Sequence, residues 1–288
     1  MTRRSWLLFG LTGFLWGIPY LFMKVAVETF NPAVIVCARV VIGSAILIPV
    51  AIAQRSLGGA LRGFKYVIPY AIFEMIGPWF FITSAEKNIS SGLAGLLVAT
   101  VPIWATIFAS INGDKTVWHH RRLFGIVIGF IGVFALVGIE SITGNSSLIS
   151  IGMVLLAAIA YSYAVNMITM KLPGVSGIAI NAVAMGFTAI FYLPFAILQW
   201  PDTAIPVKAS LSLISLGILC TALAFVVFFQ VMKEIGPARA SLVTYVNTAV
   251  AVLLGVVVLS EPITLGIAIG LPLVLVGSYF ASRKPVSV

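Results

Sequence analysis

Long apolar runs separated by short polar or basic loops dominate the chain from end to end. A membrane-spanning helix needs about 20 consecutive, largely apolar residues. Ten segments satisfy this requirement: residues 7–27, 31–53, 65–84, 89–111, 122–139, 150–170, 176–199, 209–232, 237–259 and 263–281. The pattern therefore predicts an all-α integral membrane protein with ten transmembrane helices, whose main partner is the lipid bilayer.

The composition changes this picture little but excludes other classes. Of the 288 residues, 61% are hydrophobic and 9% are charged, whereas soluble domains carry about 25% charged residues. The net charge of +9 is of the kind that attracts nucleic acid. However, the basic residues are scattered among short loops, so we interpret them as a topology signal and expect no nucleic-acid partner.

The distribution of lysine and arginine predicts the orientation. Cytoplasmic loops of membrane proteins carry an excess of these residues. With the N-terminus in the cytoplasm, thirteen of the 17 fall on the cytoplasmic side, while Lys24, Lys87 and Lys208 fall on the other and Arg39 lies within the second span. Both termini are therefore predicted to be cytoplasmic.

The two halves of the chain match weakly but at a nearly constant offset. Sliding the chain by 147 residues places Trp16 on Tyr163, Lys24 on Lys171 and Asp114 on Glu261. This predicts two five-helix repeats, residues 1–140 and 148–284. Because five is odd, the second repeat enters the membrane from the opposite side, which gives the inverted repeats found in many secondary transporters.

A helix–turn–helix pattern covers residues 217–247. We expect Gly236 to end the first helix and Pro237 to begin the second, since proline suits a first helical turn. Polar side chains then share one face of the second helix: Ser241, Thr244, Tyr245 and Thr248, with Asn247 beside them. Such hydroxyl and amide groups either line a cavity or join neighbouring helices, and the sequence leaves both interpretations open.

Aromatic residues deep within spans are candidates for solute contact. Trp16 and Tyr20 share a face of the first span, and Tyr163 and Asn166 share a face of the sixth. Repeat symmetry places Trp16 and Tyr163 at similar depth near the midplane, where transporter sites usually lie. An aromatic lining would bind a flat or apolar solute by stacking and dispersion. Helix packing is the alternative role.

Glu74 is the carboxylate that we place well inside a span. An ionised carboxylate at mid-bilayer costs about 3 kcal/mol or more, so its surroundings must compensate the charge. Three interpretations remain: it pairs with a cationic part of the substrate, it exchanges a proton during transport, or it hydrogen-bonds internally to a tyrosine or the backbone. Arg39 is a candidate partner, although the two residues differ in expected depth.

Helix-breaking residues inside spans predict bends. Gly17-Ile18-Pro19 and Gly77-Pro78 each combine glycine with proline, which frees a carbonyl group and bends a helix. We interpret Pro19, Gly77 and Pro78 as hinges around the solute path, with fixed kinks as the alternative.

Several kinds of chemistry lack a supporting motif. There is no GxxxxGK[ST] phosphate loop, and no Ser/His/Asp or paired-carboxylate constellation, so we expect neither an ATP-driven pump nor an enzyme. No cofactor is expected. His119 and His120 lack accompanying carboxylates or thiols, so no metal site is expected either.

Two motifs carry a family resemblance over nearly the whole chain. The G-x-x-W-G motif at Gly13, Trp16 and Gly17, and the TALAF run followed by the GPARASL turn, resemble the EamA-type branch of the drug/metabolite transporter superfamily. The resemblance implies a secondary transporter with alternating access around a midplane cavity. The chain is most similar to bacterial amino-acid exporters, including those for aromatic amino acids. This implies an amino-acid substrate and a multi-pass location in a bacterial inner membrane.

Other functions remain as alternatives. A proton-coupled exporter of cationic drugs or other small metabolites is one, although the small multidrug branch uses an acidic residue in its first helix, which this chain lacks. Glu74 could substitute from the third helix. A membrane enzyme or scaffold is a more distant alternative. We expect spans 1, 3, 4, 6, 8 and 9 to surround the central path; the oligomeric state stays open, with a monomer allowed.

Overall fold

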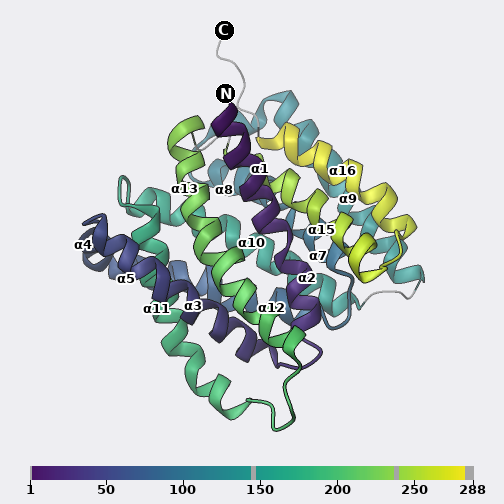
Figure 1. The fold of residues 1–288 in the computed structure, drawn as a ribbon. Helices are drawn as coiled ribbons and strands as arrows, with labels where there is room; N and C mark the ends of the chain where they lie inside the picture. Colours follow the sequence, from purple (N-terminus) through teal and green to yellow (C-terminus); the bar gives the residue numbers. More distant parts are fainter. Residues whose placement is uncertain (1, 144–146, 237–239, 283–288) are drawn as a thin grey trace.

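The computed structural model describes residues 2–143, 147–236 and 240–282, and this part of the chain is helical without β-strands (Figure 1). Its helices are α1 (Arg3–Gly17), α2 (Pro19–Ala26), α3 (Pro32–Ala53), α4 (Leu57–Arg62), α5 (Phe64–Ala71), α6 (Gly77–Ala85), α7 (Ser91–Val98), α8 (Val101–Ile111), α9 (His120–Thr143), α10 (Leu148–Lys171), α11 (Gly177–Leu198), α12 (Val207–Gly217), α13 (Ala224–Ile235), α15 (Val243–Leu259) and α16 (Leu265–Ser282). Two π-helical segments, η1 (Ile72–Ile76) and η3 (Ile218–Leu223), and a 3₁₀ turn, η2 (Lys115–Trp118), complete them.

Apolar helices occupy the ten predicted positions. Within the described residues, eight helical segments are long and apolar enough to cross a membrane, and two shorter apolar helices cover 243–259 and 265–281. The all-helical membrane class is therefore confirmed. Pro237, the expected start of the ninth span, lies outside the described residues, as do Arg283 and Lys284. The preceding helix ends at Ile235 as expected, and Gly236 has a φ of +79°, which residues with a side chain rarely adopt.

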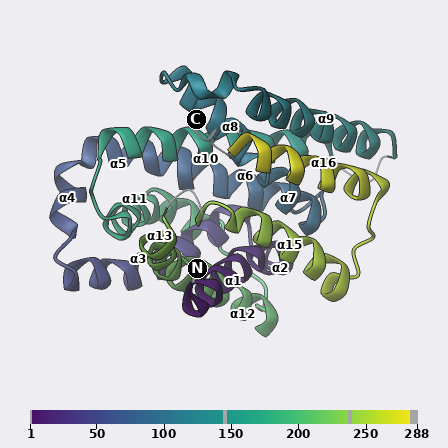
Figure 2. The same cartoon turned by 90° about the horizontal axis from the view of Figure 1, so that it is seen from above.

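Helices from the two halves of the chain pack against each other in matching pairs. In the first span, α1 contacts α13 of the eighth span and α15 of the ninth. In the sixth span, α10 contacts α6 of the third span and α8 of the fourth. The second span packs on the seventh (α3 on α11), and the fifth on the tenth (α9 on α16). Figure 2 shows α9 and α16 side by side along one flank of the bundle.

Glycines allow α9 and α16 to approach closely. A Cβ atom at Gly277 would lie 2.3 Å from the backbone nitrogen of Gly129, and one at Gly125 would lie 2.4 Å from the backbone nitrogen of Ala281. Backbones this near exclude any side chain between them, which is the arrangement small residues provide in membrane helices.

Two spans contain π-helical turns at corresponding positions. η1 lies between α5 and α6, and η3 lies between α12 and α13, with first residues 146 positions apart. The backbone N–H of Gly77 donates to the carbonyl of Ile72 across five residues. A π-turn contains one residue more than an α-turn and is frequent at functional sites. Glu74 of η1 lines the cavity described below, and Thr221 of η3 contacts Arg39 in its wall.

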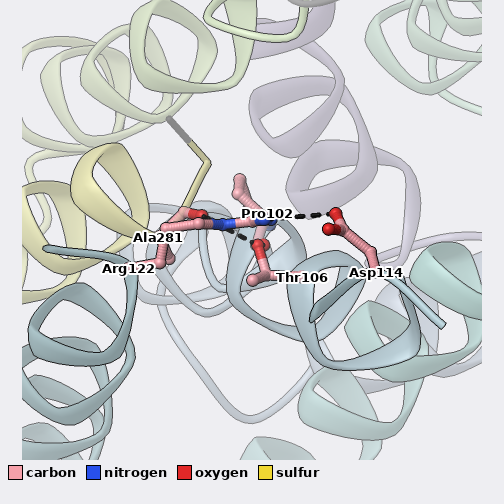
Figure 3. Close-up of polar contacts among 5 residues, drawn as sticks. All are labelled: Pro102, Thr106, Asp114, Arg122 and Ala281. Atoms are coloured by element: carbon pink, nitrogen blue, oxygen red, sulfur yellow. Dashed lines mark hydrogen bonds and ion pairs between the residues drawn. The ribbon is translucent and has the colours of Figure 1, made fainter. Parts of the chain in front are cut away.

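A polar cluster joins three helices at the end of the molecule where α8 ends and α9 begins (Figure 3). Arg122 of α9 is buried; its Nη1 lies 3.2 Å from Oδ2 of Asp114, and its Nε donates to the carbonyl of Ala281 at 3.0 Å. The Thr106 hydroxyl donates to the same carbonyl and to that of Pro102. These contacts hold α8, α9 and α16 together.

Candidate functional site

A cavity of about 1250 Å³ lies in the centre of the bundle. Its walls come from eight of the ten spans, all except the fifth and tenth among the described residues. The expectation that the second and seventh spans lie outside the path is therefore wrong, because Arg39 of α3 and Asn181 of α11 line the cavity. These helices are otherwise almost wholly apolar, so their hydropathy resembles that of lipid-facing helices.

The cavity opens at one end of the bundle. Its lining includes residues at the ends of three helices on that side: Ser56 after α3, Pro173 after α10 and Lys233 in the last turn of α13. The basic residues predict that these helix ends are cytoplasmic. From them the cavity extends inward to Tyr20, Met23 and Ile82.

Helix contacts close the opposite end. The ammonium group of Lys24 donates to the backbone carbonyls of Glu86 and Ile89, at 2.7 Å each. The carboxylate of Glu261 accepts bonds from the backbone and hydroxyl of Ser91 and, at 3.3 Å, from the backbone N–H of Gly92. Lys24 and Glu261 thus fix the loop between the third and fourth spans to the first and tenth.

Arg39 brings a cationic group into the cavity wall. Its Nε donates to the hydroxyl of Thr221 at 2.7 Å, and its guanidinium carbon lies 3.8 Å from the centre of the Trp79 ring. Thr221 belongs to η3 and donates in turn to the carbonyl of Leu216 across five residues. Cation–π contact and the hydrogen bond hold the guanidinium plane, while Nη1 and Nη2 have no hydrogen-bond partner among the described residues.

Glu74 brings a carboxyl group into the same cavity from η1. Its Oε2 is buried and has no hydrogen-bond partner in the described part of the chain. Tyr70, the tyrosine on its helical face, instead donates to Oδ1 of Asn181 at 3.2 Å. The internal hydrogen bond that was one interpretation of Glu74 is therefore absent from this part of the chain. Arg39 and Glu74 do not form an ion pair.

Five predicted site or hinge residues line the cavity: Trp16, Pro19, Tyr20, Glu74 and Asn247. Trp16 packs in the wall against Phe228 and Phe225, with ring centres 4.5 Å and 5.7 Å away. Pro19 is the first residue of α2, directly after the break at Ile18. The polar stripe of the ninth span also contributes, because Ser241, just before α15, and Thr244 of α15 belong to the lining.

The other predicted residues lie elsewhere. Tyr163 packs against Phe73 and Phe108, at 5.0 Å and 5.7 Å between ring centres, and is 39% exposed. Asn166 accepts a hydrogen bond from Asn112 at 2.7 Å, and the Tyr245 ring contacts that of Tyr279. Gly77 and Pro78 begin α6 behind the wall. None of the five belongs to the cavity lining.

Tyr161 occupies the cavity face of α10 in place of Tyr163. Both tyrosines lie deep in the same span, but two residues along a helix correspond to a rotation of about 200°. Electrostatic interactions link the Tyr161 hydroxyl to both Glu74 and Arg39. Both tyrosines lie within the predicted sixth span, and the repeat offset favours Tyr163 because Tyr163 matches Trp16.

Comparisons with known proteins give consistent results. The EamA-like transporter family matches this chain twice, at residues 4–138 and 148–283. An uncharacterized transporter of Archaeoglobus fulgidus is 25% identical, over 98% of this chain and 99% of its own. The uncharacterized transporter YoaV of Bacillus subtilis is 27% identical, over 94% and 95%. YedA of Escherichia coli K12, an uncharacterized inner membrane transporter, is 25% identical, over 94% and 90%.

One solved crystal structure has the same fold. Its chain superposes with a TM-score of 0.68 over 97% of both chains, at 20% sequence identity. At this level of identity the likeness concerns the fold alone.

Proposed function

Because the chain belongs to the EamA-like transporter family, we propose that it exports amino acids, with aromatic amino acids favoured, by alternating access around the central cavity. The observation that carries the proposal is the cavity itself, which is open at one end and closed at the other by Lys24 and Glu261. A transporter held in one of its two access states has this form.

Inverted repeats are part of this proposal. An inverted repeat pairs each span of the first half with the span five positions later. Under this pairing, the contacts of the first span (α1) with the eighth (α13) and ninth (α15) correspond to those of the sixth span (α10) with the third (α6) and fourth (α8). The same pairing maps the pairs α3–α11 and α9–α16 onto themselves. The double family match and the two π-turns support the same assignment. With cytoplasmic termini, the described cavity faces the cytoplasm.

The aromatic and polar walls support the choice of substrate. Trp16, Trp79 and Phe228 offer ring surfaces, which suit a flat apolar side chain. Thr244 and Asn247 offer neutral hydrogen-bonding groups on α15. The resemblance to amino-acid exporters supports the same class. The solute and the bilayer are the partners that this function requires.

Counterflow tests the proposal without any assumption about the driving force. Purified protein is reconstituted into proteoliposomes loaded with unlabelled phenylalanine, and uptake of labelled phenylalanine or tryptophan is followed. Threonine, methionine, lysine and glutamate serve as competitors. Accumulation competed by aromatic amino acids supports a selective exporter, and competition by many amino acids indicates a broad one. No accumulation by folded protein would contradict the proposal.

One observation favours the proton-coupled cation exporter as the second candidate. Glu74 faces the cavity with a buried, unpartnered carboxylate oxygen, a placement that suits proton exchange or cation binding. Transport driven by a pH gradient, compared between wild type and Glu74→Gln, distinguishes the candidates. Loss of pH-driven flux in the variant supports proton coupling through Glu74, and unchanged flux excludes it.

A further inference from the structure

An arginine and a glutamate face one cavity without pairing with each other. Arg39 lies on α3 of the first half, and its Nε contacts Thr221 of the second half. Glu74 lies on η1, and neither an ion pair nor a hydrogen bond engages its carboxylate within the described residues. A charge in the low-dielectric interior of a membrane protein is costly unless it is paired. The cavity therefore presents a guanidinium group and a carboxyl group, and neither has a partner of opposite charge among the described residues.

The orientation of Arg39 prepares it for a carboxylate. Nε already donates its hydrogen bond to the Thr221 hydroxyl, and the Trp79 ring covers one face of the guanidinium, with its centre 3.8 Å from the guanidinium carbon. The nitrogens that remain without a partner are Nη1 and Nη2, the two that form a fork. A guanidinium fork binds a planar carboxylate through two parallel hydrogen bonds.

Glu74 is prepared for an ammonium group. Its neighbours Tyr70 and Tyr161 carry no positive charge, and Tyr70 already donates its proton to Asn181. The carboxylate therefore lacks a donor in the described structure. Tyr161, which also lines the cavity, interacts electrostatically with both Glu74 and Arg39, so the two groups lie near the same tyrosine.

We propose that Arg39 and Glu74 form the two poles of a zwitterion site, in which Arg39 binds the α-carboxylate of the solute and Glu74 binds its α-ammonium group. A solute with one charge neutralises one pole and leaves the other unpaired. A zwitterion neutralises both. The apolar side chain then extends toward Trp16 and Phe228. This assignment rests on the proposed amino-acid transport and specifies how the amino acid is recognised.

The test compares phenylalanine with two analogues that each lack one charge. These are 3-phenylpropionate, without the ammonium group, and 2-phenylethylamine, without the carboxylate. The concentration of each compound that halves counterflow of labelled phenylalanine is measured in proteoliposomes containing wild type, Arg39→Gln or Glu74→Gln. Lys208→Gln is the matched control, because Lys208 pairs with Glu28 on the surface and is outside the cavity.

Each variant should lose one kind of discrimination. Wild type and the control should prefer phenylalanine to both analogues by about tenfold or more, the usual effect of losing a charge-assisted hydrogen bond. Glu74→Gln should lose the preference over 3-phenylpropionate and keep that over 2-phenylethylamine. Arg39→Gln should show the reverse. If both variants keep both preferences, the zwitterion site is wrong while amino-acid transport stands.

A second readout separates this result from a failure of transport. Stabilisation of the detergent-purified protein by the same three compounds is measured as a shift in melting temperature, which needs no flux. If wild type neither transports nor is stabilised by phenylalanine, the proposed function fails, and the site fails with it. If an Arg39→Gln preparation does not fold, Arg39→Lys replaces it. The lysine keeps the charge but not the fork, so its preference over 2-phenylethylamine should be reduced; an unchanged preference would overturn the role of Arg39.

Discussion

Glu261 caps the helix that begins at Ser91. The carboxylate accepts a hydrogen bond from the Ser91 backbone N–H at 2.9 Å and another from the Ser91 hydroxyl at 2.8 Å. Acceptors at a helix N-terminus satisfy N–H groups that have no partner within the helix, and a negative charge there is favourable. Because Glu261 precedes the last span, this cap connects the tenth span to the fourth at the closed end of the cavity.

Removing the cap should weaken the closed end. Glu261→Ala loses charge-assisted hydrogen bonds worth about 1.5–3 kcal/mol, so we expect a lower melting temperature in detergent and a larger fraction of molecules open at this end. Glu261→Gln keeps one hydrogen-bond acceptor, so its melting temperature should fall less than that of Glu261→Ala. Glu28→Gln is the control, since the Glu28–Lys208 pair is exposed at the same end and worth less than about 1 kcal/mol. Equal losses for Glu261→Ala and the control would contradict the capping role.

Glu86 should make stability depend on pH. Burial raises the pKa of this carboxyl well above its usual range, Lys24 lowers it, and Glu261 raises it further. Both carboxylate oxygens are buried without a partner in the described structure, because the Lys24 ammonium contacts backbone carbonyls instead. The folded protein thus prefers the protonated acid. The stability that this raised pKa contributes to the folded protein is complete at a pH below the ordinary carboxyl pKa. It is lost as the pH rises through the elevated pKa of Glu86.

Melting temperature measured across pH tests this sign. Wild type should lose stability from acidic toward alkaline pH, by about 1.4 kcal/mol per unit of pKa elevation. Glu86→Gln mimics the protonated acid, so it should be more stable than wild type at alkaline pH and should flatten the profile. If the melting temperature of Glu86→Gln depends on pH in the same way as that of wild type, groups other than Glu86 cause the pH dependence.

Trp16 and Tyr163 should differ in their effect on transport, although the repeat makes them counterparts. Trp16→Ala removes an indole from the cavity wall and its contacts with Phe225 and Phe228, so we expect a severalfold loss of phenylalanine counterflow. Tyr163→Ala removes a ring outside the cavity lining and should leave the affinity for phenylalanine near that of wild type. Initial rates over a range of concentrations, normalised to reconstituted protein, measure both. A larger loss of affinity in Tyr163→Ala would reverse this assignment.

Gly277 should be essential for the contact between α9 and α16. A methyl group at this position would collide with the backbone of Gly129, so Gly277→Ala must separate the helices. We expect destabilisation of about 1–3 kcal/mol, as for other overpacked sites. Gly152→Ala is the matched control, because a Cβ on that helical glycine meets nothing within 4 Å. Thermal unfolding in detergent compares the two, and equal stability of both variants would contradict the close packing.

Periodicity and charge were sufficient to predict the helices, because a bilayer imposes length and hydropathy on each span. They did not predict which side chains of each helix point into the cavity. Tyr161 and Tyr163 differ by two positions, and only packing decides which of them faces the cavity. Arg39 was placed within the second span, but the apolar sequence around Arg39 and Asn181 did not predict that their side chains face the cavity. The repeat offset predicted equivalent positions for Trp16 and Tyr163, but of the two only Trp16 lines the cavity.

The π-turns have a consequence for insertions and deletions. Each turn holds one residue more than the helix around it requires. Deleting one residue from 72–76 or 218–223 would convert the π-turn into an ordinary α-turn and leave the register of the flanking helices intact, whereas a deletion elsewhere in the same spans would rotate everything beyond it by about 100°. Related sequences should therefore tolerate single-residue gaps in these two segments more readily than in the rest of the third and eighth spans.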